Sequence, residues 1–184
     1  MIAGTAAASV PPAAIVVLAA RGAGLAGRLR AALGGDARVH APACVDCPGA
    51  EVRFAKLLPH LQALFRDGAP IVGLCATGIL VRALAPLIGD KRAEPPVVAV
   101  AEDGSAVVPL LGGHRGANRL ALAIAAGLGG GTRAVVTTAG DLRLGLPLDE
   151  PPEGWTLANP EAARDVAARL LDGAPVRLEG EPGL

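Results

Sequence analysis

The sequence predicts an α/β fold: an open, mostly parallel sheet with helices on both faces, one antiparallel hairpin, and a C-terminal connector that leads into a helix. Short apolar runs rich in β-branched residues alternate with stretches of helical periodicity, as in parallel sheets whose strands are buried on both faces. Asp103-Gly104 separates two strand-like runs, which is typical of a tight hairpin. The length of 184 residues suits one domain with a sizeable core.

The first half of the chain alternates strands with helices. Apolar runs of strand length lie at 13–20, 37–42 and 70–76. Residues 25–33 are expected to form a helix, and residues 52–65, which include Phe54, repeat large apolar side chains at helical spacing. Pro59 lies inside this second helix, so we expect the helix to kink or split there.

The second half continues the alternation. A helix at 79–88 should bend at Pro86, and the residues at 95–111 should form the hairpin. An alanine-rich helix begins near Asn118, and the run at 133–139 is the last strand that the pattern supports. We therefore expect the α/β domain to cover residues 12–141.

Residues 142–184 form a separate region in this prediction. A proline-rich connector leads to Asn159 and Pro160, which are typical of the N-cap and first residue of a helix. We expect this helix to pack outside the sheet. The strand-like residues 174–180 have no partner in the sequence, so the chain looks cut short there, and we expect a C-terminal domain to be absent from it.

Charge and composition disfavour several classes of partner. The 17 basic and 17 acidic side chains cancel, and two Phe, one Trp and no Tyr leave little to stack on bases, so we expect no nucleic acid partner. No uninterrupted apolar window is long enough to span a membrane. No basic residue precedes the first apolar run, and Pro11-Pro12 interrupts it, so we expect a cytoplasmic protein without an export signal.

The first candidate site is a metal site. His40, Cys44 and Cys47 could supply three zinc ligands, but a closed site needs a fourth. Neither Cys75 nor His60 has a partner at suitable spacing. We therefore expect loop thiols and no metal.

The second candidate is a dinucleotide-binding site. Gly22, Gly24 and Gly27 form the spacing G-x-G-x-x-G between a predicted strand and a helix. The next strand should then end in an acidic residue that holds the ribose, but it ends near His40, and Asp46 lies beyond it in a loop. We interpret the glycines as a tight turn and expect no NAD or other cofactor.

The segment from Gly112 to Asn118 combines several features of a ligand-binding site. Gly112, Gly113 and Gly116 let the backbone approach a ligand closely, and a helix N-terminus that follows them favours an anion. Histidine titrates near neutral pH, so His114 suits general acid or base catalysis. The alternative is that His114 only hydrogen-bonds its own loop.

Further candidate residues follow other predicted strands. Because ligands bind beyond the carboxyl ends of parallel strands, we expect Thr77-Gly78, Thr137-Thr138 and Asp141 to converge on this loop. Basic residues are also concentrated in this part of the sequence, which suits a ligand with several carboxylates. These basic residues are Arg82, Lys91, Arg92, Arg115 and Arg119.

Several blocks in residues 73–141 together carry a resemblance to a known family. They are Gly78-Ile79 to Arg82, Ala85-Pro86, Asp90-Lys91, the Pro95-Pro96 strand, the Gly113-His114 loop with Asn118, and the Thr137-Thr138 strand end. In this order they resemble the N-terminal domain of the cobalamin-biosynthesis G family, the cobalt-precorrin-5A hydrolases. The connector and the helix after it are similar to the segment that links this domain to the family's C-terminal domain.

The resemblance implies a corrin precursor rimmed with acetate and propionate groups as substrate. The family reaction opens a δ-lactone and releases a two-carbon fragment as acetaldehyde, which requires an activated water and a polarised acyl carbonyl. On this resemblance His114 or Asp141 is the candidate base, and Lys91 with the loop N–H groups is the candidate anion stabiliser.

The loop departs from the pattern Ser-Gly-His-x-Gly-Gly-Ala-Asn of anaerobic-pathway members, because the segment from Gly112 to Asn118 is one residue shorter. It is more similar to members fused to a precorrin-3B C-17 methyltransferase, in which the fragment leaves by another route. The alternative function is therefore a tetrapyrrole-binding or assembly domain whose partners are a fused methyltransferase or other cobalamin-pathway enzymes. An NAD-dependent oxidoreductase is a distant third reading.

Overall fold

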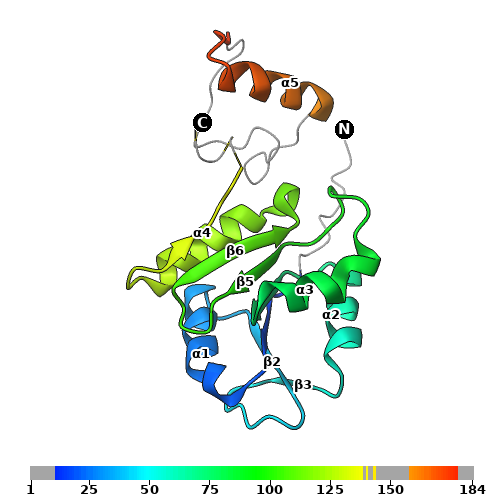
Figure 1. Cartoon of the computed structure of the whole chain (residues 1–184), viewed down its shortest axis with the longest axis vertical. Helices are drawn as coiled ribbons and strands as arrows, with labels where there is room; N and C mark the ends of the chain where they lie inside the picture. The colour runs from blue at the N-terminus through cyan, green and yellow to red at the C-terminus, as the bar shows by residue number, and fades with distance from the viewer. Residues whose placement is uncertain (1–10, 139, 141–142, 144–157, 178–184) are drawn as a thin grey trace, which may run out of the picture. The chain divides into compact units, whose positions relative to one another are not determined.

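A seven-stranded sheet in the order β3-β2-β1-β4-β5-β6-β7 forms the centre of the computed structural model (Figure 1). The structure describes residues 11–138, 140, 143 and 158–177. The strands are β1 (Ala14–Val17), β2 (Arg38–Pro42), β3 (Val52–Phe54), β4 (Ile71–Leu74), β5 (Val97–Val100), β6 (Ala106–Leu111) and β7 (Arg133–Ala134). β1 to β5 are parallel, β6 is antiparallel to β5, and β7 is parallel to β6. The predicted mostly parallel sheet with one antiparallel hairpin is confirmed.

Helices cover both faces of this sheet, as predicted. They are α1 (Ala23–Ala32), α2 (Leu57–Arg66), α3 (Thr77–Leu84) and α4 (Ala117–Leu128), with short 3-10 turns η1 (Ala20–Gly22), η2 (Ala85–Leu87) and η3 (Gly113–Arg115). α1 packs beside α4 on one face, and α2 packs beside α3 on the other (Figure 1). None of the helices formed by the described residues combines the length and apolar character that crossing a bilayer requires.

The core follows from the alternation of side chains along each strand. In β1, Ile15 and Val17 pack with α1 and α4, whereas Val16 packs with α2 and α3. All three are at most 1% exposed, which explains why this strand reads as a continuous apolar run. A Cβ on Gly127 of α4 would lie 2.5 Å from the Cβ of Ala32, so this glycine allows α4 to approach α1 closely.

The chain divides into a unit over residues 1–135 and a second unit over residues 136–184. The second unit contains α5 (Pro160–Leu171), which begins after Asn159 as expected. The packing of α5 on the sheet stays a prediction. Residues 174–177 form no regular structure, and the rest of the strand-like run to residue 180 lies outside the described residues.

The helix expected over 52–65 is wrong in its first part. Residues Val52–Phe54 form β3, because they pair in parallel with β2 and because the Glu51 carboxylate accepts the Val39 N–H at 2.7 Å. The helix begins only at Leu57, so Pro59 lies in the first turn, where a missing N–H leaves no helical hydrogen bond unmade. The expected kink is therefore replaced by a helix start.

The last strand is shorter than expected, because β7 has only two residues. The N–H groups of Arg133 and Val135 donate to the carbonyls of Ser105 and Val107. The next bond of this parallel ladder would need an N–H at position 109, where β6 has Pro109, so the ladder ends.

A histidine pair joins β2 to α2. Nδ1 of His40 and Nε2 of His60 are 2.9 Å apart, and the His60 ring stacks on Phe54 with ring centroids 4.5 Å apart. His40 is only 6% exposed. Burial lowers the pKa of His40 to about 4, and burial also lowers the pKa of His60.

We expect this pair to make the fold sensitive to mild acid. The folded-state pKa of His40 lies below the value of about 6.5 for an unfolded chain, so the unfolded state binds more protons between these values. Stability should be full above about pH 6.5 and should fall as the pH drops toward about 4. Melting temperatures measured across this range should fall by about 5 °C or more in the parent and by clearly less in His40→Gln, which cannot titrate. An equal fall in both proteins would contradict the assignment.

Candidate functional site

Two left-handed glycines bracket His114. Gly112 follows β6 with φ +74°, η3 carries His114, and Gly116 with φ +93° starts α4. Position 112 needs glycine for two reasons. Its φ is positive, and a Cβ there would overlap the carbonyl of Pro95. The loop that carries His114 is therefore seated directly on the residues that precede β5.

Hydrogen bonds inside this loop use several of its N–H groups. Arg115 and Ala117 both donate to the Gly112 carbonyl, at 2.9 and 3.1 Å, and Gly116 donates to Gly113 at 3.1 Å. These three N–H groups hold the turn itself. The predicted anion site at the start of α4 stays a prediction.

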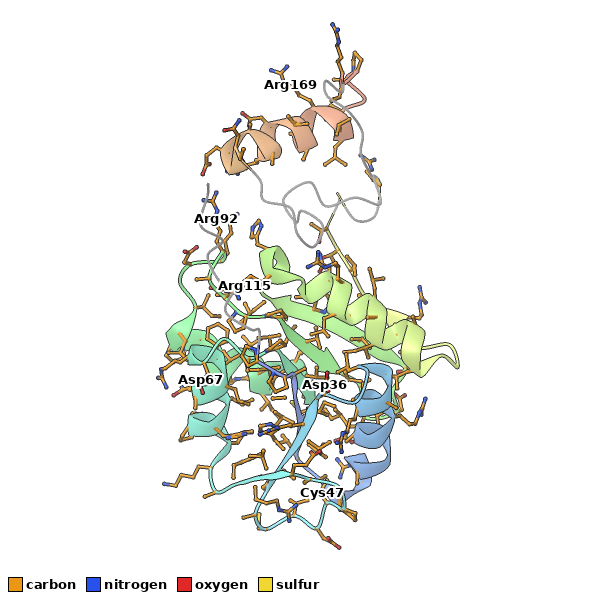
Figure 2. The ribbon with its side chains drawn as sticks, turned by 180° about the vertical axis from the view of Figure 1, so that it is seen from behind. Asp36, Cys47, Asp67, Arg92, Arg115 and Arg169 are labelled. Carbon is orange, nitrogen blue, oxygen red and sulfur yellow. The ribbon has the colours of Figure 1, made fainter. Side chains whose placement is uncertain are left out.

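Two loops with basic residues, and the first turn of α4, meet at this edge of the sheet. We call these basic residues the amino-edge cluster, because they lie where β4 and β5 begin. An Nη1–H of Arg115 donates to the carbonyl of Ala93 at 3.5 Å, which joins the His114 loop to the loop of Lys91 and Arg92. Figure 2 shows Arg92 and Arg115 at the same end of the domain. The members of the cluster are Lys91, Arg92, His114, Arg115 and Arg119.

Most of this cluster faces solvent. Lys91, Arg92, Arg115 and Arg119 are exposed and His114 is half-buried, whereas Asn118 in the first turn of α4 is buried. A Cβ on Gly116 would lie 3.0 Å from a guanidinium nitrogen of Arg119, so Arg119 covers the start of α4. The arrangement offers several cations on one surface, which suits a ligand with several carboxylates.

The sequence prediction missed Glu94, which lies next to this cluster. Glu94 is 7% exposed, and its Oε1 accepts the N–H of Gly89 at 3.0 Å. A buried carboxylate beside exposed cations is unusual. Its position just before Pro95-Pro96 and a buried strand is the only signal of it in the sequence.

Thr77, Gly78 and Arg82 do not join the cluster. Leu74 pairs with Val100 at the end of β5, whereas Leu111 pairs with Val97 at its start. Thr77 and Gly78 therefore lie at the carboxyl edge of the sheet, across the length of β5 from the His114 loop. Arg82 donates to the carbonyl of Gly78 at 3.1 Å, so its guanidinium is directed to that edge too.

The remaining predicted site residues belong to the second unit. Thr137 and Thr138 are exposed residues of that unit, and Asp141 lies outside the described residues. Their expected convergence on His114 stays a prediction.

The Gly22 turn lies at the carboxyl edge, between β1 and α1. A Cβ on Gly22 would lie 2.8 Å from a methyl of Val17, whereas one on Gly24 or Gly27 would meet nothing within 4 Å. β2 ends at Pro42, without an acidic residue. Arg21 instead forms a two-pronged ion pair with Glu102 at 2.7 and 2.8 Å, which lowers the pKa of that carboxyl and ties the turn to the β5–β6 hairpin.

The residues considered for zinc are not gathered. His40 bonds to His60 on one face of the sheet, and the buried Cys47 packs on the other, with the core around α1. Cys44 is exposed. Among the residues that the structure describes, no three or more His, Cys, Asp or Glu side chains are placed to hold a metal ion.

Comparisons with known proteins agree on one family. Residues 59–141 match the family model described as cobalamin synthesis G N-terminal. The chain is 31% identical over 126 residues to the cobalt-precorrin-5A hydrolase of Priestia megaterium, which covers 67% of this chain and 33% of that protein. It is 45% identical over 86 residues to the cobalt-precorrin-5A hydrolase of Salmonella typhimurium, which covers 46% of this chain and 24% of that protein.

A solved structure supports the fold. A cobalamin biosynthesis protein G homolog from Sulfolobus solfataricus superimposes with a TM-score of 0.53 at 19% identity, over 94% of this chain and 52% of that one. The chain thus spans about a third or less of the two curated relatives and about half of this structural neighbour.

The close approach of Gly112 to Pro95 predicts a specific sensitivity. Gly112→Ala should destabilise the domain by about 2 kcal/mol or more, because it adds left-handed strain and a clash with backbone. Gly113→Ala is the matched control, since a Cβ there meets nothing within 4 Å, and it should change stability by less than about 0.5 kcal/mol. Urea denaturation of both variants measures the difference, and equal values would remove the close approach from the argument.

The Gly22 turn predicts no measurable binding of NAD or NADP. The turn lacks an acidic partner for the ribose, and Gly27 does not mediate the close packing of helix on strand that the dinucleotide motif needs. Calorimetric titration of the parent with either nucleotide should give no heat beyond dilution. A saturable signal that Gly24→Ala removes would show that the prediction is wrong.

Proposed function

Through residues 59–141 this chain belongs to the cobalamin synthesis G N-terminal family, and on that premise we propose that its amino-edge cluster binds a cobalt-precorrin and serves the opening of the substrate's lactone. The observation that carries the proposal is the contact between the loop of Lys91 and Arg92 and the loop of His114, which Arg115 makes with the Ala93 carbonyl and Gly112 makes with Pro95. The whole chain has a formal net charge of zero, so this positive surface is a local feature.

The chemistry of the ligand fits this surface. Corrin precursors carry acetate and propionate groups around their rim, and guanidinium groups bind carboxylates through paired hydrogen bonds. Exposed cations on two loops can contact several carboxylates of one large ring. Charge at the rim also speeds the encounter with an anionic ligand.

The reaction needs a base and an anion stabiliser. In our proposal His114 takes a proton from a water molecule as the water oxygen bonds to the lactone acyl carbon. Lys91 stabilises the oxyanion that forms, and the ring C–O bond then breaks and its oxygen receives a proton. The hydroxyl formed in this way then loses its proton and becomes the aldehyde C=O as the C–C bond between the two-carbon fragment and the macrocycle breaks. The macrocycle keeps the electron pair of that bond and takes up a proton, and the fragment leaves as acetaldehyde. Asp141 stays the alternative base.

The proposal assigns different roles to the other predicted binding residues. Thr137 and Thr138 stay proposed contacts of the substrate. Thr77, Gly78 and Arg82 belong to the opposite edge, so the proposal does not require them for binding at the amino edge. Gly112, Gly113, Gly116 and Asn118 shape the loop that presents His114.

The proposal also includes the compartment and the protein partners of this chain. Cys44, Cys47 and Cys75 are free thiols, which fits a reducing compartment, and we place the reaction in the cytoplasm. Enzymes of the same pathway, including a fused methyltransferase domain, are the proposed partners. A binding domain without catalysis stays the alternative, favoured by the short loop between Gly112 and Asn118.

Titration with uroporphyrin, a tetrapyrrole that carries acetate and propionate groups, tests the binding surface. Lys91→Ala and Arg115→Ala should each weaken binding about five- to tenfold at low salt, and the loss should shrink as salt screens the carboxylates. His114→Asn should also weaken binding while its melting temperature stays near that of the parent. Arg82→Ala is the matched control at the opposite edge and should bind like the parent.

The outcomes separate the candidate functions. Unchanged affinity in all three amino-edge variants would remove this loop from the site, and a loss confined to Arg82→Ala would move the site to the carboxyl edge. Acetaldehyde release from cobalt-precorrin-5A by the parent, abolished in His114→Asn, would support catalysis. Binding without release would support the binding-domain alternative.

A further inference from the structure

We propose that Glu94 is a positioning residue that holds the two basic loops of the amino-edge cluster in register, an inference that rests on the proposed function of that cluster. Glu94 is 93% buried and is followed by Pro95 and Pro96, which lead into β5, and the reaction described above does not use it. A carboxylate is rarely buried to this extent unless it is bound. Its hydrogen bonds and its neighbours indicate what it holds.

Glu94 closes the loop that carries Lys91 and Arg92. Its Oε1 accepts the N–H of Gly89 at 3.0 Å, which joins the two ends of this loop. Inside the loop, the carbonyl of Asp90 accepts the N–H groups of Ala93 and Glu94 at 2.9 and 3.1 Å. The Asp90 side chain accepts the N–H of Arg92 at 3.0 Å. The loop is thus a closed turn with Lys91 and Arg92 exposed on its outside.

The residues on either side of Glu94 contact the His114 loop. Its predecessor Ala93 accepts a hydrogen bond from Arg115, and its successor Pro95 has the carbonyl against which Gly112 packs. A shift of Glu94 would therefore move both contacts at once. The spacing between the Lys91 loop and the His114 loop depends on the anchor between them.

The residue that follows Glu94 fixes its backbone. Pro95 follows directly and restricts Glu94 to extended backbone, so the side chain is held on one side of the loop. The anchor is therefore rigid before the ligand arrives.

Two substitutions separate the reach of Glu94 from its charge. Glu94→Asp keeps the charge but is one methylene too short for the Gly89 N–H, whereas Glu94→Gln keeps the reach and loses the charge. Amide hydrogen exchange of Gly89, Arg115 and Ala117 reports the anchor and the His114 loop without any ligand. Uroporphyrin titration reports the binding surface. Glu102→Gln, at the opposite edge, is the matched control.

Positioning predicts opposite outcomes for the two variants. In Glu94→Asp, exchange at Gly89, Arg115 and Ala117 should speed up about tenfold and uroporphyrin affinity should fall about fivefold. Glu94→Gln should stay within about twofold of the parent in exchange and recover most of the affinity, as should Glu102→Gln. A structural role alone would lower the melting temperature of Glu94→Asp and leave exchange in the His114 loop unchanged.

The exchange measurement decides the inference independently of the ligand. Unchanged exchange at Arg115 and Ala117 in Glu94→Asp, or fast exchange at Gly89 in Glu94→Gln, would overturn it. If the parent does not bind uroporphyrin, the proposed function fails, but the exchange pattern still shows whether Glu94 positions the two loops.

Discussion

The antiparallel pairing of β6 on β5 is the constraint on which the site depends. Because Leu111 pairs with Val97, the chain leaves β6 beside the start of β5 and not beside its end. The His114 loop therefore meets the loop that enters β5, and Gly112 packs on the Pro95 carbonyl. A parallel β6 would have placed His114 beside Thr77 at the other edge. The direction of β6 thus determines which basic residues lie on the same surface.

The two edges of the sheet have different characters as a result. The carboxyl edge, where ligands of open parallel sheets usually bind, holds the Arg21–Glu102 ion pair across the β1–α1 turn and the hairpin. This ion pair is exposed, so it adds little stability. At the amino edge, two loops with basic residues lie in contact, and Glu94 at their junction is buried. The uneven distribution gives a chain of zero net charge one surface suited to a polyanion.

The loops of the site are held by fewer contacts than the core that supports them. The core residues of β1, β4 and β5 are almost fully buried between two helical layers, and they supply a rigid support. The loops that carry Lys91 and His114 are held by a few hydrogen bonds and one close backbone contact. Small changes at those contacts can therefore alter the site without unfolding the sheet.

The sequence by itself determined the strands at the centre of the sheet, the hairpin at Asp103-Gly104 and the glycines around His114, because burial on both faces and positive φ restrict the residue types that fit. The hairpin already implied an antiparallel β6, so the amino-edge position of His114 was available from the same signal. Only the tertiary structure decided that Val52–Phe54 pair with β2, that Pro109 ends the β7 ladder, and that Glu94 is buried. The first two depend on a strand elsewhere in the chain and the third on how the loops pack, and local periodicity contains no information about either.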